Sequence, residues 1–267
     1  MISYWQAVTI ICATFNARLA VKLTLESLLR NTDDRVRVII ADNGSTDGTW
    51  QELRRFRRLE RVDSDRRARR LGFKHGLPTQ ERLHGATLDW LITQVRTPYF
   101  LTLDSDVEFL KPGWLPRLLD FAERNRLAAL GEFDPGHGAY RPRLSPHVLL
   151  VNTEEFLKLR STFRAFVLIS DASEAKRWCA KEHDFCLDPR VMKSFRSARF
   201  YPTGSAFFER IILCKRPWGI SSNQMTSDYR HFGHMSWALG TKSSARQAMA
   251  DAHQRRENYI KHRLASY

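Results

Sequence analysis

Apolar runs and amphipathic segments alternate along the first half of the chain. Three short runs rich in β-branched and aromatic residues are typical of buried strands: 8–13, 36–41 and 99–104. Apolar residues at helical spacing predict four helices, namely one that Asn16 caps, one after the polar loop 42–49, one around 83–92 and one at 114–125. Strands that alternate with helices in this way predict an α/β fold with a mostly parallel sheet.

The pattern is less regular past about residue 133. The predicted elements there are a Gly/Pro-rich connection at 134–146, a strand at 147–152, and helices at 153–160, 203–215 and 243–264. The last of these helices is polar and basic. We therefore divide the chain into three units, which are residues 1–133, residues 134–242 and a basic C-terminal helix at 243–267.

Polar residues follow each of the three strands predicted in the first half. Because parallel strands end at one edge of a sheet, where ligands bind in open α/β folds, these residues are expected to lie together. They are Thr14 and Asn16 after the first strand, Asp42 and Asn43 after the second, and Asp104 and Asp106 after the third. Two carboxylates two positions apart project to the same side of an extended chain and form a hard oxygen site. This spacing predicts a site for Mg²⁺ or Mn²⁺ at Asp104 and Asp106.

The chain is strongly basic, with an excess of 43 − 29 = 14 positive charges and a pI near 10. Such a surface attracts nucleic acid, anionic lipid headgroups, acidic polysaccharide or a diphosphate. Nine arginines lie in residues 54–70, which we interpret as a solvated helix face that runs into a basic loop. Because few aromatic residues lie among these arginines, nucleic acid is not an expected partner, although a basic nucleic-acid-binding module stays an alternative function.

Features of secretion or membrane insertion are not found in the sequence. No apolar run approaches the roughly 20 residues that span a bilayer. The first residues have neither a basic region nor a small-residue cleavage site, and the four cysteines have no paired spacing. These features predict a cytoplasmic protein, which its positive charge could bring to the inner face of an anionic membrane.

Three segments together resemble glycosyltransferase family 2, over roughly residues 7–133. They are VTIICATFN, then IIADNGSTDGTW about thirty residues later, then TPYFLTLDSDVEFLKPGWL. The resemblance implies an A-type glycosyltransferase fold, which is a Rossmann-like sheet flanked by helices with a smaller acceptor-side C-terminal half. It also implies a metal-dependent, inverting transfer of a sugar from a nucleoside-diphosphate donor to a hydroxyl of a glycan or lipid-linked acceptor, as in polysaccharide, glycolipid or cell-envelope glycan synthesis.

The resemblance also implies roles for the residues at the strand ends. Residues 1–133 would bind the donor, and residues 134–242 would bind the acceptor and complete the metal site. Asp42 would pair with the nucleobase, Thr14, Asn16 and Asn43 would line the nucleotide, and Asp104 and Asp106 would hold the metal. Many members carry an A-R-N-like segment before this acidic pair, where the chain has HGATLDWL, so His84 is the predicted phosphate-facing residue, with Lys74 and His75 as alternatives.

Two late clusters would complete the site by the same resemblance. In DYRHFGHMSW, His231 is expected to join the metal ligands, and an imidazole beside two carboxylates favours Mn²⁺ over Mg²⁺. The alternative is a histidine that is hydrogen-bonded within the core. In KEHDFCLD, Asp184 is the expected general base. Other carboxylates stay open for that role, and they are Glu182, Asp188, Asp171 and Glu209.

A second enzyme class shares the predicted fold. Sugar-phosphate nucleotidyltransferases carry a Gly-rich, Arg-containing loop after the first strand. The corresponding segment here is ATFNARLA, which is not such a loop. Glycosyl transfer is therefore the favoured function, and nucleotidyl transfer is the alternative within this fold.

Overall fold

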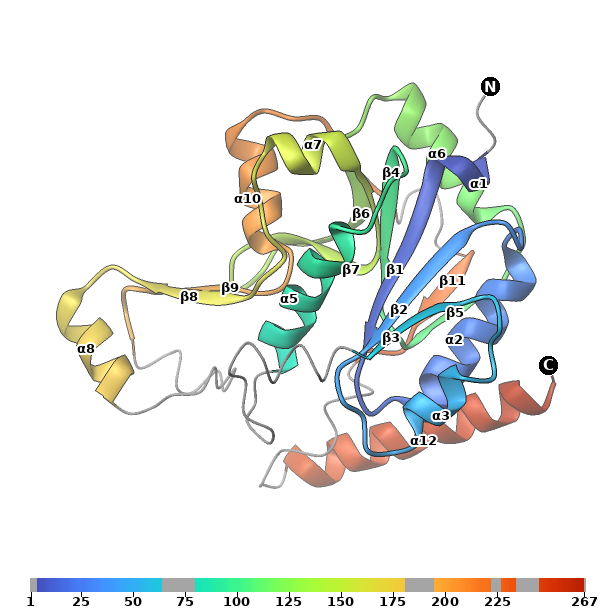
Figure 1. Ribbon diagram of the computed structural model, residues 1–267. Coiled ribbons are helices and arrows are strands. Elements are labelled where there is room, and N and C mark those ends of the chain that lie inside the picture. Colours follow the sequence, from blue (N-terminus) through green and yellow to red (C-terminus); the bar gives the residue numbers. More distant parts are fainter. Residues whose placement is uncertain (1–3, 64–79, 181–194, 222–226, 234–244, 267) are drawn as a thin grey trace.

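A computed structural model describes residues 4–63, 80–180, 195–221, 227–233 and 245–266 (Figure 1). The strands are β1 (Val8–Thr14), β2 (Arg37–Asp42), β3 (Glu60–Asp63), β4 (Tyr99–Leu103), β5 (Val107–Phe109), β6 (Ala129–Asp134), β7 (Arg143–Asn152), β8 (Phe166–Ile169), β9 (Ala198–Tyr201), β10 (Trp218–Ile220) and β11 (Tyr229–His231). The helices are α1 (Tyr4–Ala7), α2 (Arg18–Asn31), α3 (Thr49–Leu53), α5 (Gln80–Ile92), α6 (Trp114–Arg124), α7 (Thr153–Lys158), α8 (Ala172–Ala180), α10 (Ser205–Leu213) and α12 (Ala245–Ala265). Among these described residues, no helix is both long and apolar enough to cross a membrane.

The main sheet has seven strands in the order β10-β6-β7-β4-β1-β2-β3. Strands β1 to β4 run parallel, β7 runs antiparallel to both of its neighbours, and β6 and β10 pair in parallel. Helices α2 and α6 cover one face, and α5 and α10 cover the other (Figure 1). The predicted α/β fold with a mostly parallel sheet is confirmed.

Strand β1 shows why the apolar runs become central strands. All seven of its residues are buried. Val8, Ile10 and Cys12 pack toward α2 and α6, whereas Ile11 and Ala13 pack toward α5. Each fully buried Val or Ile side chain stabilises the fold by roughly 1.5–3 kcal/mol. A strand covered on both faces therefore needs a continuous apolar sequence rather than an alternating one.

Helix α2 begins differently from the prediction, because Asn16 does not cap it. The N-cap residue is Ala17, and Asn16 has a positive φ of 45°. The amides of residues 16–18 instead donate to side chains of the segment between β2 and the start of α3. These hydrogen bonds are Asn16 N to Ser45 Oγ (2.8 Å), Ala17 N to Thr49 Oγ1 (3.0 Å) and Arg18 N to Asp47 Oδ2 (3.0 Å). The loop after β2 therefore satisfies the free donors of α2 and fixes the two strand-end loops together.

Helix α3 ends at Leu53 and residues 60–63 form a strand, so the interpretation of residues 54–63 as a helix face that runs into a loop was wrong. This strand is β3, parallel to β2 at the edge of the sheet. The Arg37 guanidinium donates to both carboxylate oxygens of Glu60, each at 2.7 Å, and thereby joins the two strands. A short, charged edge strand does not offer a template for pairing with another chain.

The sheet continues past residue 133, where the sequence pattern was irregular. Strand β6 was not predicted, and β7 begins at Arg143, inside the predicted connection. The predicted helices 203–215 and 243–264 correspond to α10 and α12. Strands β8 and β9 form a separate ribbon that extends from the body, with α8 at its end (Figure 1). The division at residues 133 and 242 stays a prediction.

Strand β5 lies outside the main sheet and is held by α2. Amides of Val107 and Phe109 donate to Thr24 Oγ1 and Ser27 Oγ, each at 3.0 Å. Both hydroxyl groups are buried, and residues three apart lie on one face of a helix. The helix thus accepts hydrogen bonds that a neighbouring strand would otherwise accept. This contact fixes the chain just after Asp104 and Asp106.

We expect Thr24→Val to lower the free energy of unfolding by about 1–3 kcal/mol, because the buried Val107 amide loses its acceptor while the side-chain shape is kept. Urea denaturation checks this. The matched control is Thr93→Val, whose exposed hydroxyl contacts only the end of α5, and its change should stay within about 0.5 kcal/mol. Equal effects of the two substitutions would contradict the contact.

Candidate metal centre and nucleotide-binding site

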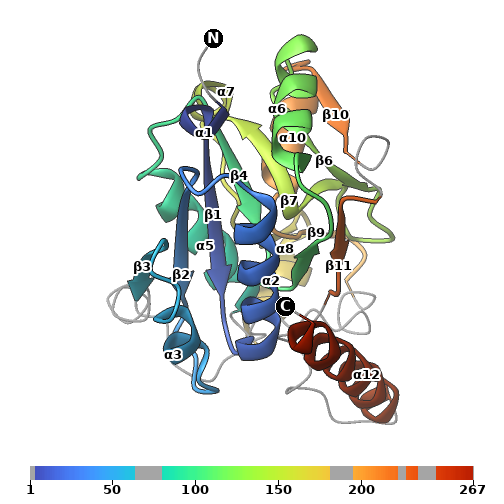
Figure 2. The ribbon, with the colours of Figure 1, turned by 90° about the vertical axis from the view of Figure 1, so that its right-hand side faces the viewer.

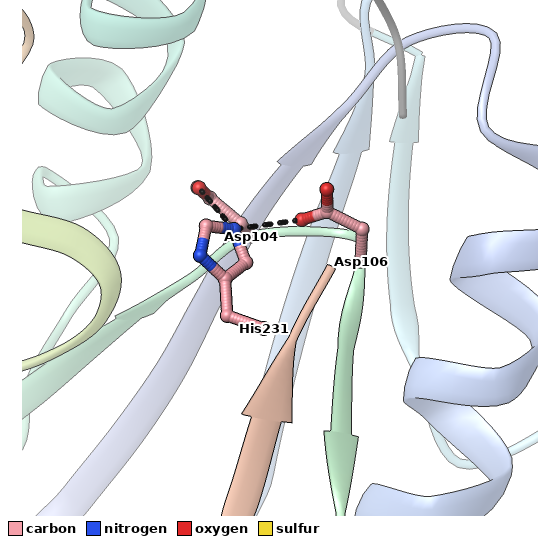
Figure 3. Close-up of side chains that lie close together, drawn as sticks. All are labelled: Asp104, Asp106 and His231. Atoms are coloured by element: carbon pink, nitrogen blue, oxygen red, sulfur yellow. Dashed lines mark ion pairs between the residues drawn. The ribbon is translucent and has the colours of Figure 1, made fainter. Parts of the chain in front are cut away.

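Three predicted ligands meet at the carboxyl end of β4. Asp104 directly follows β4, Asp106 directly precedes β5, and His231 is the last residue of β11 (Figure 3). One ligand atom of each lies within 4.8 Å of the others. The His231 Nε2 atom is 3.2 Å from Asp106 Oδ1 and 3.8 Å from Asp104 Oδ2. The structure therefore brings together the acidic pair and the histidine, which lie more than a hundred positions apart in sequence.

Strand pairing explains how the distant histidine reaches the acidic pair. Strands β5 and β11 form an antiparallel ribbon in which His231 lies opposite Val107. The next amide, that of Phe232, donates to the carbonyl oxygen of Asp106 at 2.9 Å. These backbone contacts hold the imidazole beside the Asp106 carboxylate.

The charges around the cluster favour a cation. Burial lowers the pKa of His231, but the hydrogen bond and charge of Asp106, with the charges of Asp104 and Glu132, outweigh burial and hold that pKa above its ordinary value. Burial raises the pKa of the Cys12 thiol, and the charges of Asp104 and Asp106 raise it further. The Oδ1 atom of Asp104 is buried without a hydrogen-bond partner in the described parts of the chain. Two carboxylates and an imidazole, with one oxygen unsatisfied, fit a divalent ion such as Mn²⁺.

A histidine and a glutamate behind His231 were missed by the sequence reasoning. The ring of His147 stacks on that of His231, with centroids 4.2 Å apart and an angle of 12° between planes. The Nε2 atom of this buried histidine lies 2.9 Å from Glu132 Oε2. Contact with His147 lowers the pKa of Glu132, and this effect outweighs the opposing effect of burial. The sequence feature that could have indicated His147 is its position as a polar residue at the start of the predicted strand 147–152.

His84 lies at the edge of the metal cluster rather than on the outer surface. Its Nε2 atom is 3.4 Å from Asp104 Oδ1, and 23% of the side chain is exposed. Helix α5 carries it and approaches the backbone of residues 163–164 so closely that only Gly85 fits. A Cβ atom there would lie 2.4 Å from the Phe163 carbonyl oxygen. The phosphate-facing role of His84 stays a prediction.

The residues predicted to line the nucleotide lie at the adjacent ends of β1 and β2. Thr14 and Asp42 are partners in the parallel register, and the Asn43 amide donates to the Thr14 carbonyl at 2.9 Å. The Thr14 hydroxyl is buried and has no hydrogen-bond partner within the described ranges. Asp42 is buried, and its Oδ1 atom accepts from the Ser45 amide at 3.2 Å.

Two amide side chains fix this loop region. The Asn16 side-chain oxygen accepts from the Thr46 amide at 2.8 Å, and that of Asn43 accepts from the Thr87 hydroxyl at 2.8 Å. Asn16 therefore bridges the loops after β1 and β2, and Asn43 joins β2 to α5. The four predicted nucleotide residues share one edge of the sheet, and their contacts with a nucleotide stay a prediction.

The predicted general base, Asp184, lies outside the described residues. Two alternatives for the base, Glu182 and Asp188, also lie outside them, as do Lys74 and His75, the alternatives for the phosphate-facing residue. The remaining two alternatives for the base, Glu209 and Asp171, have structural partners. Glu209 accepts from Arg141 at 3.0 Å and from the Tyr201 hydroxyl at 3.2 Å, and Asp171 accepts from the Glu174 amide near the start of α8 at 2.8 Å.

The sequence was compared with known protein families and proteins. The sequence profile described as Glycosyl transferase family 2 matches residues 9–167, which is more than half of the chain and includes β1, β2, β4 and the acidic pair. The chain belongs to glycosyl transferase family 2. A relative within the curated proteins is an uncharacterized glycosyltransferase of Haemophilus influenzae, 24% identical over 127 residues, which are 47% of this chain and 36% of that protein.

Two solved structures are similar to this chain at low sequence identity. TarS of S. aureus has a TM-score of 0.45 and 17% identity, over 94% of this family 2 chain and 43% of the TarS chain. The mannosyltransferase PcManGT of Pyrobaculum calidifontis, solved with GDP-Man and Mn²⁺, has a TM-score of 0.42 and 15% identity, over 58% and 47% of the two chains. The chain spans less than two thirds of the length of each of these relatives.

We expect Asp106→Asn to weaken Mn²⁺ binding by more than about 100-fold, since even the loss of groups behind a ligand costs 10- to 100-fold. Mn²⁺ titration followed by electron paramagnetic resonance measures this, and circular dichroism checks the fold. Asp120→Asn, at an exposed carboxylate on α6 that pairs with Arg124, is the matched control. Unchanged Mn²⁺ affinity in Asp106→Asn would show that the cluster is not a metal site.

Proposed function

We propose that this family 2 protein is a metal-dependent, inverting glycosyltransferase that moves a sugar from a nucleoside-diphosphate donor to a hydroxyl acceptor. The observation that carries the proposal is the cluster of Asp104, Asp106 and His231 at the carboxyl end of β4. The cluster lies beside the strand ends that carry Thr14 and Asp42. A divalent ion in such a cluster would neutralise charge on a departing nucleoside diphosphate.

The order of strands supports an arrangement in which the two substrates lie on opposite sides of the cluster. Strands β1 and β2 lie on one side of β4, and β7 and β6 lie on the other. Asp42 on β2 can accept a hydrogen bond from the imide N–H of uracil or thymine, or from guanine. With the nucleobase at Asp42 and the diphosphate at the cluster, the sugar extends toward β7 and β6. The acceptor then approaches over the antiparallel part of the sheet.

Inversion by a single displacement needs a base on the acceptor side. As the acceptor oxygen attacks the anomeric carbon, the bond to the diphosphate breaks and the base takes the hydroxyl proton. Asp184 is the residue that the sequence predicts for this role. Among the described residues, Glu132 on β6 is a carboxylate on the acceptor side of the cluster. Contact with His147 lowers its pKa and so favours the ionised form of Glu132.

The acceptor is proposed to be a glycan or a lipid-linked molecule, in polysaccharide, glycolipid or cell-envelope glycan synthesis at the cytoplasmic side of a membrane. The net charge of +14 favours an acidic acceptor or an anionic lipid surface. The same charge motivates nucleic-acid binding as the competing function. The cluster of Asp104, Asp106 and His231, at the same edge of the sheet as Asp42, favours glycosyl transfer over that function.

We expect one donor among UDP-, GDP- and dTDP-sugars to stabilise the protein only when Mn²⁺ is present. A donor at 100 times its dissociation constant raises the free energy of unfolding by roughly 2.7 kcal/mol, which a thermal-shift panel detects. Asp42→Ala should abolish this shift and raise the donor KM more than it lowers kcat.

Transfer should stop in excess EDTA, and transfer to a lipid-linked acceptor should rise when that acceptor is placed in anionic vesicles. The control for Asp42→Ala is Asp120→Asn. Undiminished transfer in EDTA, or no stabilisation by any donor, would contradict the proposed function.

Loss of the base should lower the transfer rate by about 10² to 10⁴ while donor binding is retained. We expect this of Asp184→Asn, and Glu132→Gln is tested beside it because Glu132 lies beside the cluster. Single-turnover transfer and calorimetric donor binding are the measurements. Near-normal transfer by Asp184→Asn with slow transfer by Glu132→Gln would move the role to Glu132. Near-normal transfer by both variants would place the base elsewhere.

A further inference from the structure

The C-terminal helix α12 packs against the start of α2, next to the predicted nucleotide loop. Ile260 is fully buried against Ala17, Ala20 and Leu23. Figure 2 shows α12 beside the lower part of α2, at the same end of the sheet as the site. A helix whose apolar residues dock here contacts the segment that directly follows Asn16.

A fully buried carboxylate connects α12 to the metal-binding segment. Glu108 on β5 has no exposed surface, and it lies two positions after Asp106. The Arg263 Nε atom donates to Glu108 Oε1 at 2.6 Å, and the Tyr259 hydroxyl lies 3.2 Å from Glu108 Oε2. Arg263 and Tyr259 both belong to α12. A buried charge needs partners of this kind, since removing one leaves the other charge uncompensated.

The same helix also contacts the second strand of the ribbon. The Arg230 guanidinium lies over the Tyr259 ring at 4.8 Å from its centroid, and the Phe232 ring centroid is 5.6 Å from that of Tyr259. Arg230 and Phe232 flank His231, and Arg230 lies opposite Glu108 in the antiparallel register. Residues of α12 therefore hold both strands of the β5–β11 ribbon at positions adjacent to metal ligands.

We propose that α12 is a positioning element for the metal site, in which Arg263 and Tyr259 fix Glu108 and thereby set the separation of Asp106 and His231. This proposal rests on the proposed function. Arg263 and Tyr259 contact Glu108, two positions after Asp106, and act on the cluster through Glu108 and the ribbon. The contact of Ile260 with Ala17 joins the same helix to the loop after β1. Helix α12 thus supports the predicted nucleotide side and the metal side of the site together.

Arg263→Met tests the proposal because it removes the charge that faces Glu108 and keeps an apolar stem. We expect the Mn²⁺ dissociation constant to rise about 10- to 100-fold, the range typical of groups that orient a ligand. Arg263→Lys, which keeps the positive charge, should restore part of the affinity. Arg255→Met is the matched control, an exposed arginine on the same helix, and its Mn²⁺ affinity should equal that of the unchanged protein.

Mn²⁺ binding is measured well below the melting temperature of each variant, so that the folded state is compared in all of them. This distinguishes an effect on the metal site from a mere loss of stability. Tyr259→Phe removes only the hydroxyl contact with Glu108, and it serves if Arg263→Met does not fold. We expect a smaller rise in the dissociation constant for this variant. A lower melting temperature with unchanged Mn²⁺ affinity in both variants would overturn the proposal.

Amide hydrogen exchange tests the ribbon without any metal. The Phe232 amide, which donates to the Asp106 carbonyl, should exchange faster in Arg263→Met, while amides of β1 should not. If the unchanged protein does not bind Mn²⁺, the proposed function fails, and the exchange of the Phe232 amide still decides whether α12 holds the ribbon. Unchanged exchange in that amide would overturn the proposal.

Discussion

The pairing of β5 with β11 is the contact on which the candidate site depends. It places His231 beside Asp106 although more than a hundred residues separate them, and the Phe232 amide closes the contact at the Asp106 carbonyl. Two carboxylates about 4 Å apart near a protein surface repel each other by on the order of 4 kcal/mol. The backbone must hold them against this repulsion. Buried hydroxyl groups of α2 hold one edge of β5, and β11 holds the other.

Local charge at the site opposes the charge of the whole chain. The protein carries a net charge of +14, yet Asp104, Asp106 and Glu132 all raise the pKa of His231. A cluster that stabilises a proton on an imidazole offers the same negative field to a metal ion. Under the proposed function, basic residues elsewhere would increase the concentration of anionic substrates around the molecule, while the acidic cluster would attract a cation at one point.

The central part of the fold could be predicted because buried parallel strands require continuous apolar runs, as in β1. Short strands such as β3, β5 and β11 have three or four residues and include charged ones, so periodicity does not distinguish them from loops. The spacing of the acidic pair after β4 and the family resemblance indicated that Asp104, Asp106 and His231 would lie together, as they do, and their role as metal ligands stays a prediction. Glu132 and His147 were not indicated in this way, since their role follows from pairing between distant strands. The prediction that Asn16 caps α2 was wrong because the amides of the next two residues donate to side chains of the segment after β2.

The reversal of strand direction between β4 and β7 explains why the two halves contribute different residues. Parallel strands present their carboxyl ends at the site edge, so Thr14 and Asp42 end β1 and β2, and Asp104 directly follows β4. Strand β7 runs the opposite way, and its first half therefore reaches the same edge. This is why His147 lies within the strand and opposite Asp104, whose amide donates to the His147 carbonyl at 3.1 Å. A search of this family for acceptor-side groups should accordingly examine the beginnings of antiparallel strands as well as the residues after parallel ones.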